Sequence, residues 1–552
     1  MFVRHYKNQL KLKREEIVTE SFVSKGDVHL NRRHLMAGAA AMALGATASG
    51  NPLFGVSRAY AADLAPGMTG GPTNVDGAER YQYNATMSEG RAIEGIKKLQ
   101  AAGAAPKKLT LLFVASCVPQ LVNAPPGGGE SVKDTWERET GIQLDVVGTE
   151  AGEIWKKVLQ DITTGDGSYD LYTHSWNNIG DLVSAKGALN LDGFVAKYQP
   201  DWGDPERGTP TPQIRELLYK YNGSNYAASL DGDFVTWQYR KDLMTDEGHR
   251  KNFRSKFGYD IPDQPTTWDE IDNLSEYFHD QGVGHANLLG PFWGLSNFYA
   301  RFASMKAPNN YWLDEDANPT LATPEGIKAA EAHVRSINWT SKDNLTWGWA
   351  EQYGAMANLQ ASMAMTYTNM AGINDKLKDG KPATPLYGKL AAWKPVGTKV
   401  GDHHVRRSVI YYNVTASVPA KSKYPEAAYL FLQYISSTRT YSRICGNPVG
   451  GCDPFQLANL ADPIVRANVH EYMIEPIRDT IARAVPSINF AGQGALDNAL
   501  DENLQAALTG KISAEQALKD TEQAWQKIIA RRRDETVAAI RAQRSAWPTI
   551  ID

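Results

Sequence analysis

The feature that most constrains the fold of this sequence is a regular alternation of short apolar runs and amphipathic stretches before residue 176. Three apolar runs, "KKLTLLFVAS", "GIQLDVVGT" and "YDLYTHS", are separated by two stretches with helical spacing. This order predicts a β-α-β-α-β unit, in which mostly parallel strands form one sheet covered by helices on both faces. Ligands bind at the carboxyl ends of such strands, so a site is expected where these runs end.

A second unit of the same α/β class follows along the chain. The stretches "TTWDEIDNLSEYF" and "TPEGIKAAEAHVRSI" each begin with a threonine that can cap a helix, whereas "ASMAMTYT" and "KLAAWKPVG" have the composition of strands. The chain has 552 residues, more than one core of about 250–300 residues supports, so we expect two lobes. Lysine plus arginine number 58 against 62 acidic residues, a balance that gives no support to a nucleic-acid partner.

The N-terminus has the pattern of an export signal. Arg32 and Arg33 precede an alanine- and glycine-rich run, and Ala59 and Ala61 offer a small-residue cleavage site. We therefore predict that residues 1–61 are a twin-arginine-type signal peptide with a long region ahead of the arginines, and that the mature protein is periplasmic.

The segment after the signal, residues 62–106, is rich in glycine, proline and alanine. One helix is predicted in it, beginning at Ser88. We interpret this segment as a leader arm that precedes the first lobe.

The three cysteines show no spacing typical of a metal centre. Neither C-x-x-C nor H-E-x-x-H occurs, so we expect no metal site and no cofactor. Cys445 and Cys452 bracket the turn "GNPVGG", and in an oxidising compartment they are candidates for a disulfide. Spacing does not decide whether that bond forms, and Cys117 is left over if it does.

The order of several longer motifs resembles family 1 of the extracellular solute-binding proteins. These motifs are "YDLYTHSWNNIGDLVSAKGALNLDGF", "YAASLDGDFVTWQYRKDLM", "PTTWDEIDNLSEYF", "ASMAMTYTNMAG", "SVPAKSKYPEAAYLFLQYIS" and "GNPVGG". The resemblance extends in order over residues 107–530. Members of this family are the capture subunits of ATP-binding cassette importers, mostly for sugars, oligosaccharides and polyols.

This resemblance implies a type II periplasmic binding protein fold, with two α/β lobes around a hinged ligand cleft. Carried over, lobe 1 comprises residues 107–236 plus 400–445, lobe 2 comprises 237–398 plus 446–535, and 536–552 form a C-terminal tail. It further implies a monomer without catalytic residues, which captures a carbohydrate or polyol and delivers it to an inner-membrane permease.

The candidate ligand contacts are side chains at strand ends, in the lobe crossing "SLDGDF" and in the second lobe. They are Ser116, His174, Trp176, Asn177, Asp231, Asp233, Trp293, Tyr367, Asn369 and Arg406. Carboxylates accept solute hydroxyls and aromatic rings provide apolar walls, which is the usual composition of a small-molecule pocket. The resemblance makes Asp231 the preferred acceptor and Tyr367 the stacking ring, whereas His174 fits a core position equally well.

Three other functions compete with this interpretation. Arg406 or Arg407 in the cleft would suit an acidic sugar or another anionic solute. Asp231 and Asp233, two residues apart on an extended strand, could serve a secreted glycoside hydrolase, although both would then lie on one face. A metal or iron binder of the same fold would need a cluster of ligands that no local pattern provides.

Overall fold

The computed structural model describes residues 83–125, 129–204, 215–305, 312–410, 413–486 and 489–544. All of them belong to one compact unit, Val56–Asp552. The predicted signal peptide lies outside the described residues. No helix among the residues that are described is both long and apolar enough to span a bilayer.

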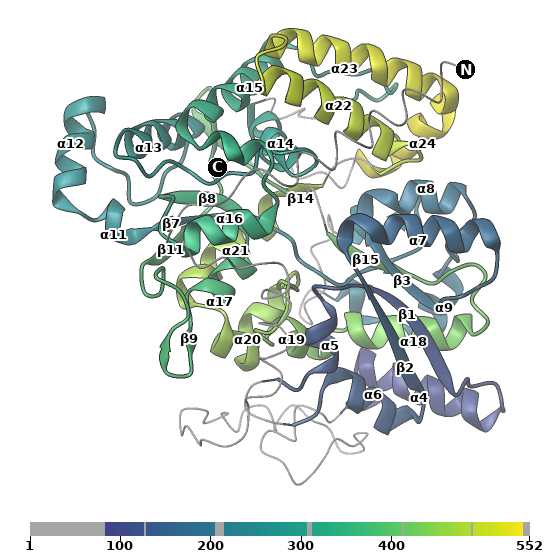
Figure 1. The fold of residues 1–552 in the computed structure, drawn as a ribbon. Coiled ribbons are helices and arrows are strands. Elements are labelled where there is room, and N and C mark those ends of the chain that lie inside the picture. The colour runs from purple at the N-terminus through teal and green to yellow at the C-terminus, as the bar shows by residue number, and fades with distance from the viewer. Residues whose placement is uncertain are drawn as a thin grey trace, which may run out of the picture. The chain divides into compact units, whose positions relative to one another are not determined.

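The first lobe is built on a five-stranded sheet in the order β2-β1-β3-β15-β6 (Figure 1). β1 (Lys108–Val114) pairs in parallel with β2 (Gln143–Thr149) and β3 (Leu171–Ser175), as the alternating pattern predicts. β15 (Val414–Ser417) runs antiparallel to β3, and β6 (Ala228–Ser229) pairs with β15. A strand from late in the sequence thus completes a sheet that the early residues begin.

Helices surround this sheet, and the helix predicted at Ser88 is one of them. They are α4 (Ser88–Ala101), α5 (Val118–Val122), α6 (Val132–Thr140), α7 (Ala151–Thr164), α8 (Ile179–Ser184), α9 (Asp192–Tyr198), α18 (Pro425–Ser436) and α19 (Thr438–Cys445). α4 packs against α18, whose residues are nearly all buried. The described part of the predicted leader arm is therefore packed into the first lobe.

The second lobe is built on a three-stranded antiparallel sheet in the order β11-β7-β8, with β7 (Val235–Arg240) between β11 (Leu390–Trp393) and β8 (Met363–Tyr367). Its helices are α11 (Lys241–Met244), α12 (Glu247–Phe257), α13 (Trp268–Asp280), α14 (Gly294–Met305), α15 (Pro324–Arg335), α16 (Trp349–Ala357), α17 (Asn369–Asn374), α20 (Pro463–Asn468) and α21 (Glu471–Arg483). Short pairs of strands complete it: β12 (Gly397–Val400) with β13 (His403–Arg406), and β14 (Ser408–Ile410) with β16 (Ala484–Pro486).

Helix caps confirm the predicted helix starts in this lobe. Thr267 and Glu270 form a reciprocal capping box at the start of α13, and the Thr323 hydroxyl accepts the Gly326 amide at the start of α15. Inside the lobe, Arg301 donates to both oxygens of Asp272 and is fully buried. These contacts hold α13, α14 and α15 in place within the second lobe.

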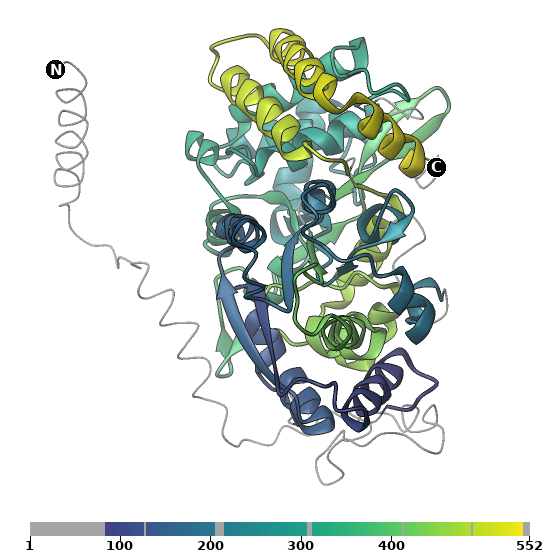
Figure 2. The ribbon, with the colours of Figure 1, turned by 90° about the vertical axis from the view of Figure 1, so that its right-hand side faces the viewer.

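The described part of the chain closes with α22 (Gln493–Leu508), α23 (Ala514–Ile529) and α24 (Arg533–Arg544). α22 and α23 lie side by side, and both contact α15 of the second lobe (Figure 2). α22 also contacts the turn Trp176–Asn178, which follows β3 of the first lobe. α22 therefore contacts both lobes, in addition to the segments in which the chain itself passes from one lobe to the other.

Candidate functional site

The chain passes between the two lobes around Gly232 (the first crossing), around Asn413 and around Asp453 (the later crossing), and these crossings lie against one another. Gly232 in the first crossing donates its N–H to the Asp453 carbonyl in a later crossing at 3.1 Å. The Asn413 side chain, in a third crossing, donates to the carbonyls of Asp231 and Gly232. A Cβ atom on Gly232 would lie 2.5 Å from the Pro454 carbonyl oxygen, so only glycine fits this approach.

The first crossing is not the extended strand that the sequence suggests. No strand covers residues 230–234, and Asp233 has a φ of +41°, in the left-handed region. The Asp231 and Asp233 carboxylates nevertheless remain close, because the chain bends back toward the later crossing. Their proximity comes from this bend and not from strand alternation.

A third acid, Asp453, completes a group that the sequence did not indicate. One carboxylate oxygen from each of Asp231, Asp233 and Asp453 lies within 4.8 Å of the other two. The three residues are 3%, 6% and 1% exposed. Burial raises the pKa of all three carboxyl groups, and for Asp233 and Asp453 the charge of Asp231 raises it further. The crossings therefore carry a buried acidic group that favours protons, hydroxyl donors or cations.

Asp231 is also part of the structure that ties the crossings together. Its Oδ1 accepts the backbone N–H of Asp453 at 2.6 Å, and its Oδ2 accepts from the Cys117 thiol, with a sulfur to oxygen distance of 3.8 Å. Each carboxylate oxygen has a second acceptor position. A role in holding a solute is thus compatible with, and additional to, this structural role.

The second lobe places an aromatic pair and an amide at the end of β8. The rings of Trp293 and Tyr367 are 6.2 Å apart in an edge-to-face arrangement. Asn369, which begins α17, accepts a hydrogen bond from the Tyr353 hydroxyl and donates to the Gly451 carbonyl at 2.7 Å. Asn369 therefore links the second lobe to the same crossing that carries Asp453.

The predicted ligand contacts of the first lobe lie in two different places. Ser116 is exposed after β1, and its carbonyl accepts the Gly451 N–H at 3.0 Å, so it lies at the crossings. Trp176 and Asn177 follow β3 and are buried, and the Asn177 amide donates to Asp497 of α22 at 3.2 Å. These two residues thus belong to the contact between the first lobe and α22.

His174 occupies a core position, the second of the two placements that the sequence left open. It is fully buried in β3, where its Nε2 contacts the Ser417 hydroxyl at 2.9 Å and its Nδ1 contacts the Ser175 carbonyl at 2.8 Å. Burial lowers its pKa to about 4, so the ring is neutral at physiological pH.

Arg406 lies in β13 and has an acidic partner from the protein itself. Its guanidinium forms an ion pair of 2.9 Å with Asp479 of α21, which also pairs with Arg483. Arg407 is buried and donates to the Arg406 carbonyl. The predicted contact of these arginines with an anionic solute is therefore in competition with internal partners.

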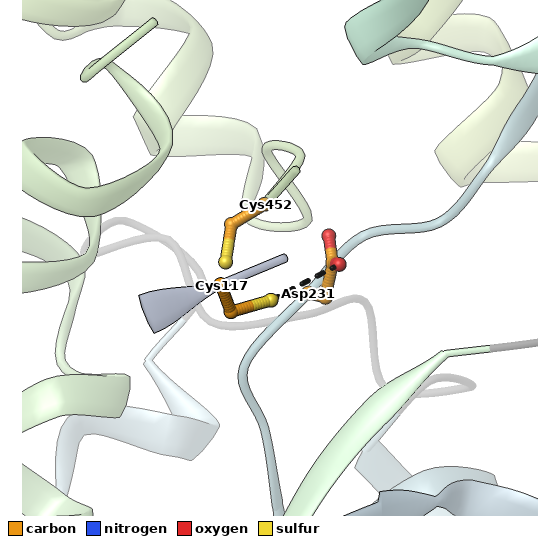
Figure 3. Close-up of side chains that lie close together, drawn as sticks. All are labelled: Cys117, Asp231 and Cys452. Carbon is orange, nitrogen blue, oxygen red and sulfur yellow. Dashed lines mark hydrogen bonds between the residues drawn. The ribbon is translucent and has the colours of Figure 1, made fainter. Parts of the chain in front are cut away.

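The cysteines differ from the predicted pairing. All three are free, so the Cys445–Cys452 bond is absent from the structure. Cys445 ends α19 and its thiol is directed at the Ser442 carbonyl, whereas the thiol of Cys452 lies beside Cys117 and Asp231 (Figure 3). The turn between Cys445 and Cys452 carries the second sulfur toward the first crossing instead of back to the helix.

A small cavity opens next to the acidic group. It has a volume of about 40 Å³, and its lining includes Gln120, Asn369, Cys452 and Asp453. A single water needs roughly 10–15 Å³ of such space, so this cavity has room for about three waters or an ion.

The comparisons with known proteins fit this architecture. Residues 126–441 match the family model of the bacterial extracellular solute-binding proteins. This match spans more than half of the chain, and the protein therefore belongs to that family.

Among individual proteins, the chain is 22% identical over 417 residues to the mannitol-binding protein of Pseudomonas aeruginosa, covering 72% of this chain and 88% of that protein. It is 20% identical over 419 residues to a probable amino-acid ABC transporter periplasmic-binding protein of Sinorhizobium fredii, covering 73% and 86%.

Among solved structures, the chain is similar to an ABC transporter solute-binding protein from Agrobacterium radiobacter K84 in complex with ribitol. The TM-score is 0.60 at 16% identity, covering 76% of this chain and 98% of that one. The expected type II periplasmic binding protein fold is thereby confirmed.

Proposed function

We propose that this protein captures a carbohydrate or polyol between its lobes and delivers it to the permease of an ABC importer. The observations that carry this proposal are the buried acidic group at the crossings and the aromatic pair Trp293 and Tyr367 on the second lobe. Carboxylates are acceptors, and a polyol presents a row of hydroxyl donors without charge. The mannitol-binding relative and the ribitol-bound structure support the same class of solute.

The cavity at the crossings is by itself too small for a polyol, so we propose that capture involves separation of the lobes. The cavity at the crossings measures about 40 Å³, whereas pockets for small molecules are usually several hundred Å³. Binding therefore proceeds by opening, loading and closure, and the closed form is favoured only through contacts that the solute makes with both lobes.

The placement of both acids on one bend of the chain favours binding over catalysis. Oxygens of Asp231 and Asp233 lie within 4.8 Å of each other, and both carboxyl groups belong to one bend. Glycosidases place their two carboxyl groups on opposite sides of the bond, about 5–9.5 Å apart. In the proposed function, the protein binds its solute without altering it chemically.

Two substitutions at the acidic group test the proposal. Asp231→Asn and Asp233→Asn preserve shape and remove a charge-assisted acceptor. The substitution at the carboxylate that contacts the solute should weaken solute binding by about 1.5–3 kcal/mol, roughly ten- to hundredfold. Calorimetry against polyols, hexoses and amino acids identifies the class, with Glu331→Gln on the exposed face of α15 as a matched control. If both variants bind as tightly as wild type, or if the solute is recovered chemically altered, the proposal fails.

We also propose export by the twin-arginine route to the periplasm and action as a monomer, with no nucleic-acid partner. The support is Arg32 and Arg33 ahead of the alanine-rich run, together with membership of an extracellular family. Changing both arginines to lysine should leave precursor in the cytoplasm. Normal periplasmic accumulation of that variant would contradict this route.

A further inference from the structure

Three side chains that are far apart in the sequence meet beside the crossings. Cys117 precedes α5 in the first lobe, Asp231 belongs to the first crossing, and Cys452 belongs to a later one (Figure 3). One donor atom from each lies within 4.8 Å of the other two, and the Cys117 sulfur is 3.8 Å from Asp231 Oδ2. All three residues are buried.

This geometry suits a tetrahedral cation. With Zn–S bonds of about 2.3 Å and Zn–O bonds of about 2.0–2.2 Å, neighbouring ligand atoms in a tetrahedral site are about 3.5–3.8 Å apart. The distance of 3.8 Å between the Cys117 sulfur and the Asp231 oxygen is already of this size. Only small side-chain adjustments would bring the Cys452 sulfur into the same shell.

The backbone around the two cysteines is held in place. The side chain of Gln120, in α5, donates to the carbonyls of Asn447 and Cys452 at 3.0 and 3.2 Å. Its oxygen accepts the Cys452 N–H at 2.6 Å. One glutamine thus fixes the later crossing to the helix that follows Cys117, which gives the preorganisation that a metal site needs.

The charges beside the site point to a cation independently of the sulfurs. Asp231, Asp233 and Asp453 are buried together, and none of the described lysines or arginines forms an ion pair with them. Asp453 Oδ2 is buried and makes no hydrogen bond of good geometry, although the carboxylate lies close enough to Thr368 and to the Asn369 N–H for both to lower its pKa. Buried carboxylates in native proteins become protonated, pair with a cationic side chain or bind a metal, so a divalent cation at this group would replace the protons that burial favours there.

The cavity at the crossings gives access from this side. Its lining includes both Cys452 and Asp453, and its volume of about 40 Å³ exceeds that of one ion. An ion in this cavity would therefore contact Cys452 and Asp453 directly.

We propose that Cys117, Cys452 and Asp231 bind a thiophilic divalent cation, for which Zn²⁺ is the probe, with Asp453 as the nearest further donor. Each thiol releases its proton on binding and no electron is transferred, so affinity rises with pH. The bound cation fixes two crossings to the first lobe and leaves the second lobe free to move. This proposal does not depend on the identity of the solute.

The test uses the full mature chain, reduced, stripped of metal with a chelator and then freed of both reagents. Zn²⁺ should bind with one equivalent tighter than about 1 µM, measured by competition with a chromophoric chelator. Co²⁺ should give the near-ultraviolet charge-transfer band of thiolate ligation. Cys117→Ser combined with Cys452→Ser should weaken Zn²⁺ binding at least about 100-fold and abolish the band.

Cys445→Ser is the matched control, because Cys445 is a buried free cysteine close in sequence that lies outside the site. This variant should bind Zn²⁺ within twofold of wild type. A readout on wild type does not depend on the folding of any variant: Zn²⁺ should slow alkylation of Cys117 and Cys452, located by peptide mapping, and leave that of Cys445 unchanged.

Several results would overturn the proposal. They are the absence of the cobalt band, Zn²⁺ binding that persists in the double variant, alkylation that Zn²⁺ does not slow, and a Cys117–Cys452 disulfide in protein purified without reductant. Solute affinity measured on the same samples separates the two proposals, since loss of metal binding with intact solute binding leaves the proposed function standing.

Discussion

Asp497 of α22 provides a quantitative test of the contact between the first lobe and the C-terminal helices. Its Oδ1 accepts from the Tyr299 hydroxyl at 3.0 Å and from the Gln493 amide at 2.9 Å, and its Oδ2 accepts from the Asn177 amide at 3.2 Å. Burial nevertheless raises its pKa from 3.8 to about 6, because these neutral donors compensate only part of the lost hydration. Asp497→Asn should therefore change how stability depends on pH.

The sign and size follow from proton linkage. A carboxyl group with a higher pKa in the folded state binds its proton more tightly there, so its contribution to stability is complete below pH 4 and is lost as the pH rises through 6. A shift of about two pKa units corresponds to about 3 kcal/mol over the whole range. Between pH 5 and pH 8 the loss is about 1.4 kcal/mol.

The asparagine variant keeps the shape of the contact. Its side-chain oxygen can accept from Tyr299 and Gln493, and Asn177 can present its own oxygen to the new amide group by a 180° turn. The free energy of unfolding should be measured by urea denaturation at pH 5, 6, 7 and 8 for both proteins. His285 and His333, whose pKa burial lowers to about 4 and about 3, are present in both and cancel in the difference.

The expected result is that wild type loses about 1–1.5 kcal/mol relative to Asp497→Asn between pH 5 and pH 8. Glu331→Gln, on the exposed face of α15, should run parallel to wild type. A difference between wild type and Asp497→Asn that stays constant over this pH range would refute the reasoning and show that Asp497 is ionised throughout.

The remaining predictions concern packing. Arg301→Met should cost about 3–5 kcal/mol, because it leaves Asp272 buried with only the half-exposed Arg335 as partner, whereas Arg335→Met should cost below about 1 kcal/mol. Equal melting temperatures of the two variants in calorimetry would contradict this prediction. Gly232→Ala should cost about 1–3 kcal/mol, since its Cβ would lie 2.5 Å from the Pro454 carbonyl oxygen. If Gly232→Ala leaves both the melting temperature and the solute affinity unchanged, the close approach of Gly232 to Pro454 does not contribute to stability and the reasoning is wrong.

The sequence predicted the parts of this fold that depend on local pattern. The three apolar runs became β1, β2 and β3 of one parallel group, and Thr267 and Thr323 cap the helices that they were expected to begin. These features depend on residues within one or two turns, where period and capping chemistry act directly.

The site depends on contacts that no local pattern contains. Cys117 and Cys452 lie far apart in the sequence, and only the meeting of the crossings brings their sulfurs together. His174 was ambiguous for another reason: every residue of β3 is buried, so alternation could not separate core from cleft. The run "GGCDPF" was the available signal for Asp453, an acid directly after a glycine turn at a crossing.

The position of β15 has a consequence for synthesis. It pairs with β3 inside the first sheet, where Ser417 contacts His174 from 243 residues away. Until that strand leaves the ribosome, β3 presents an unpaired edge, which is a hazard for aggregation. The strands of the second sheet, which end at Trp393, have all emerged by then. The sheet that begins first is therefore completed after the sheet of the second lobe, and a nascent chain that stalls before residue 414 exposes this edge for as long as it stalls.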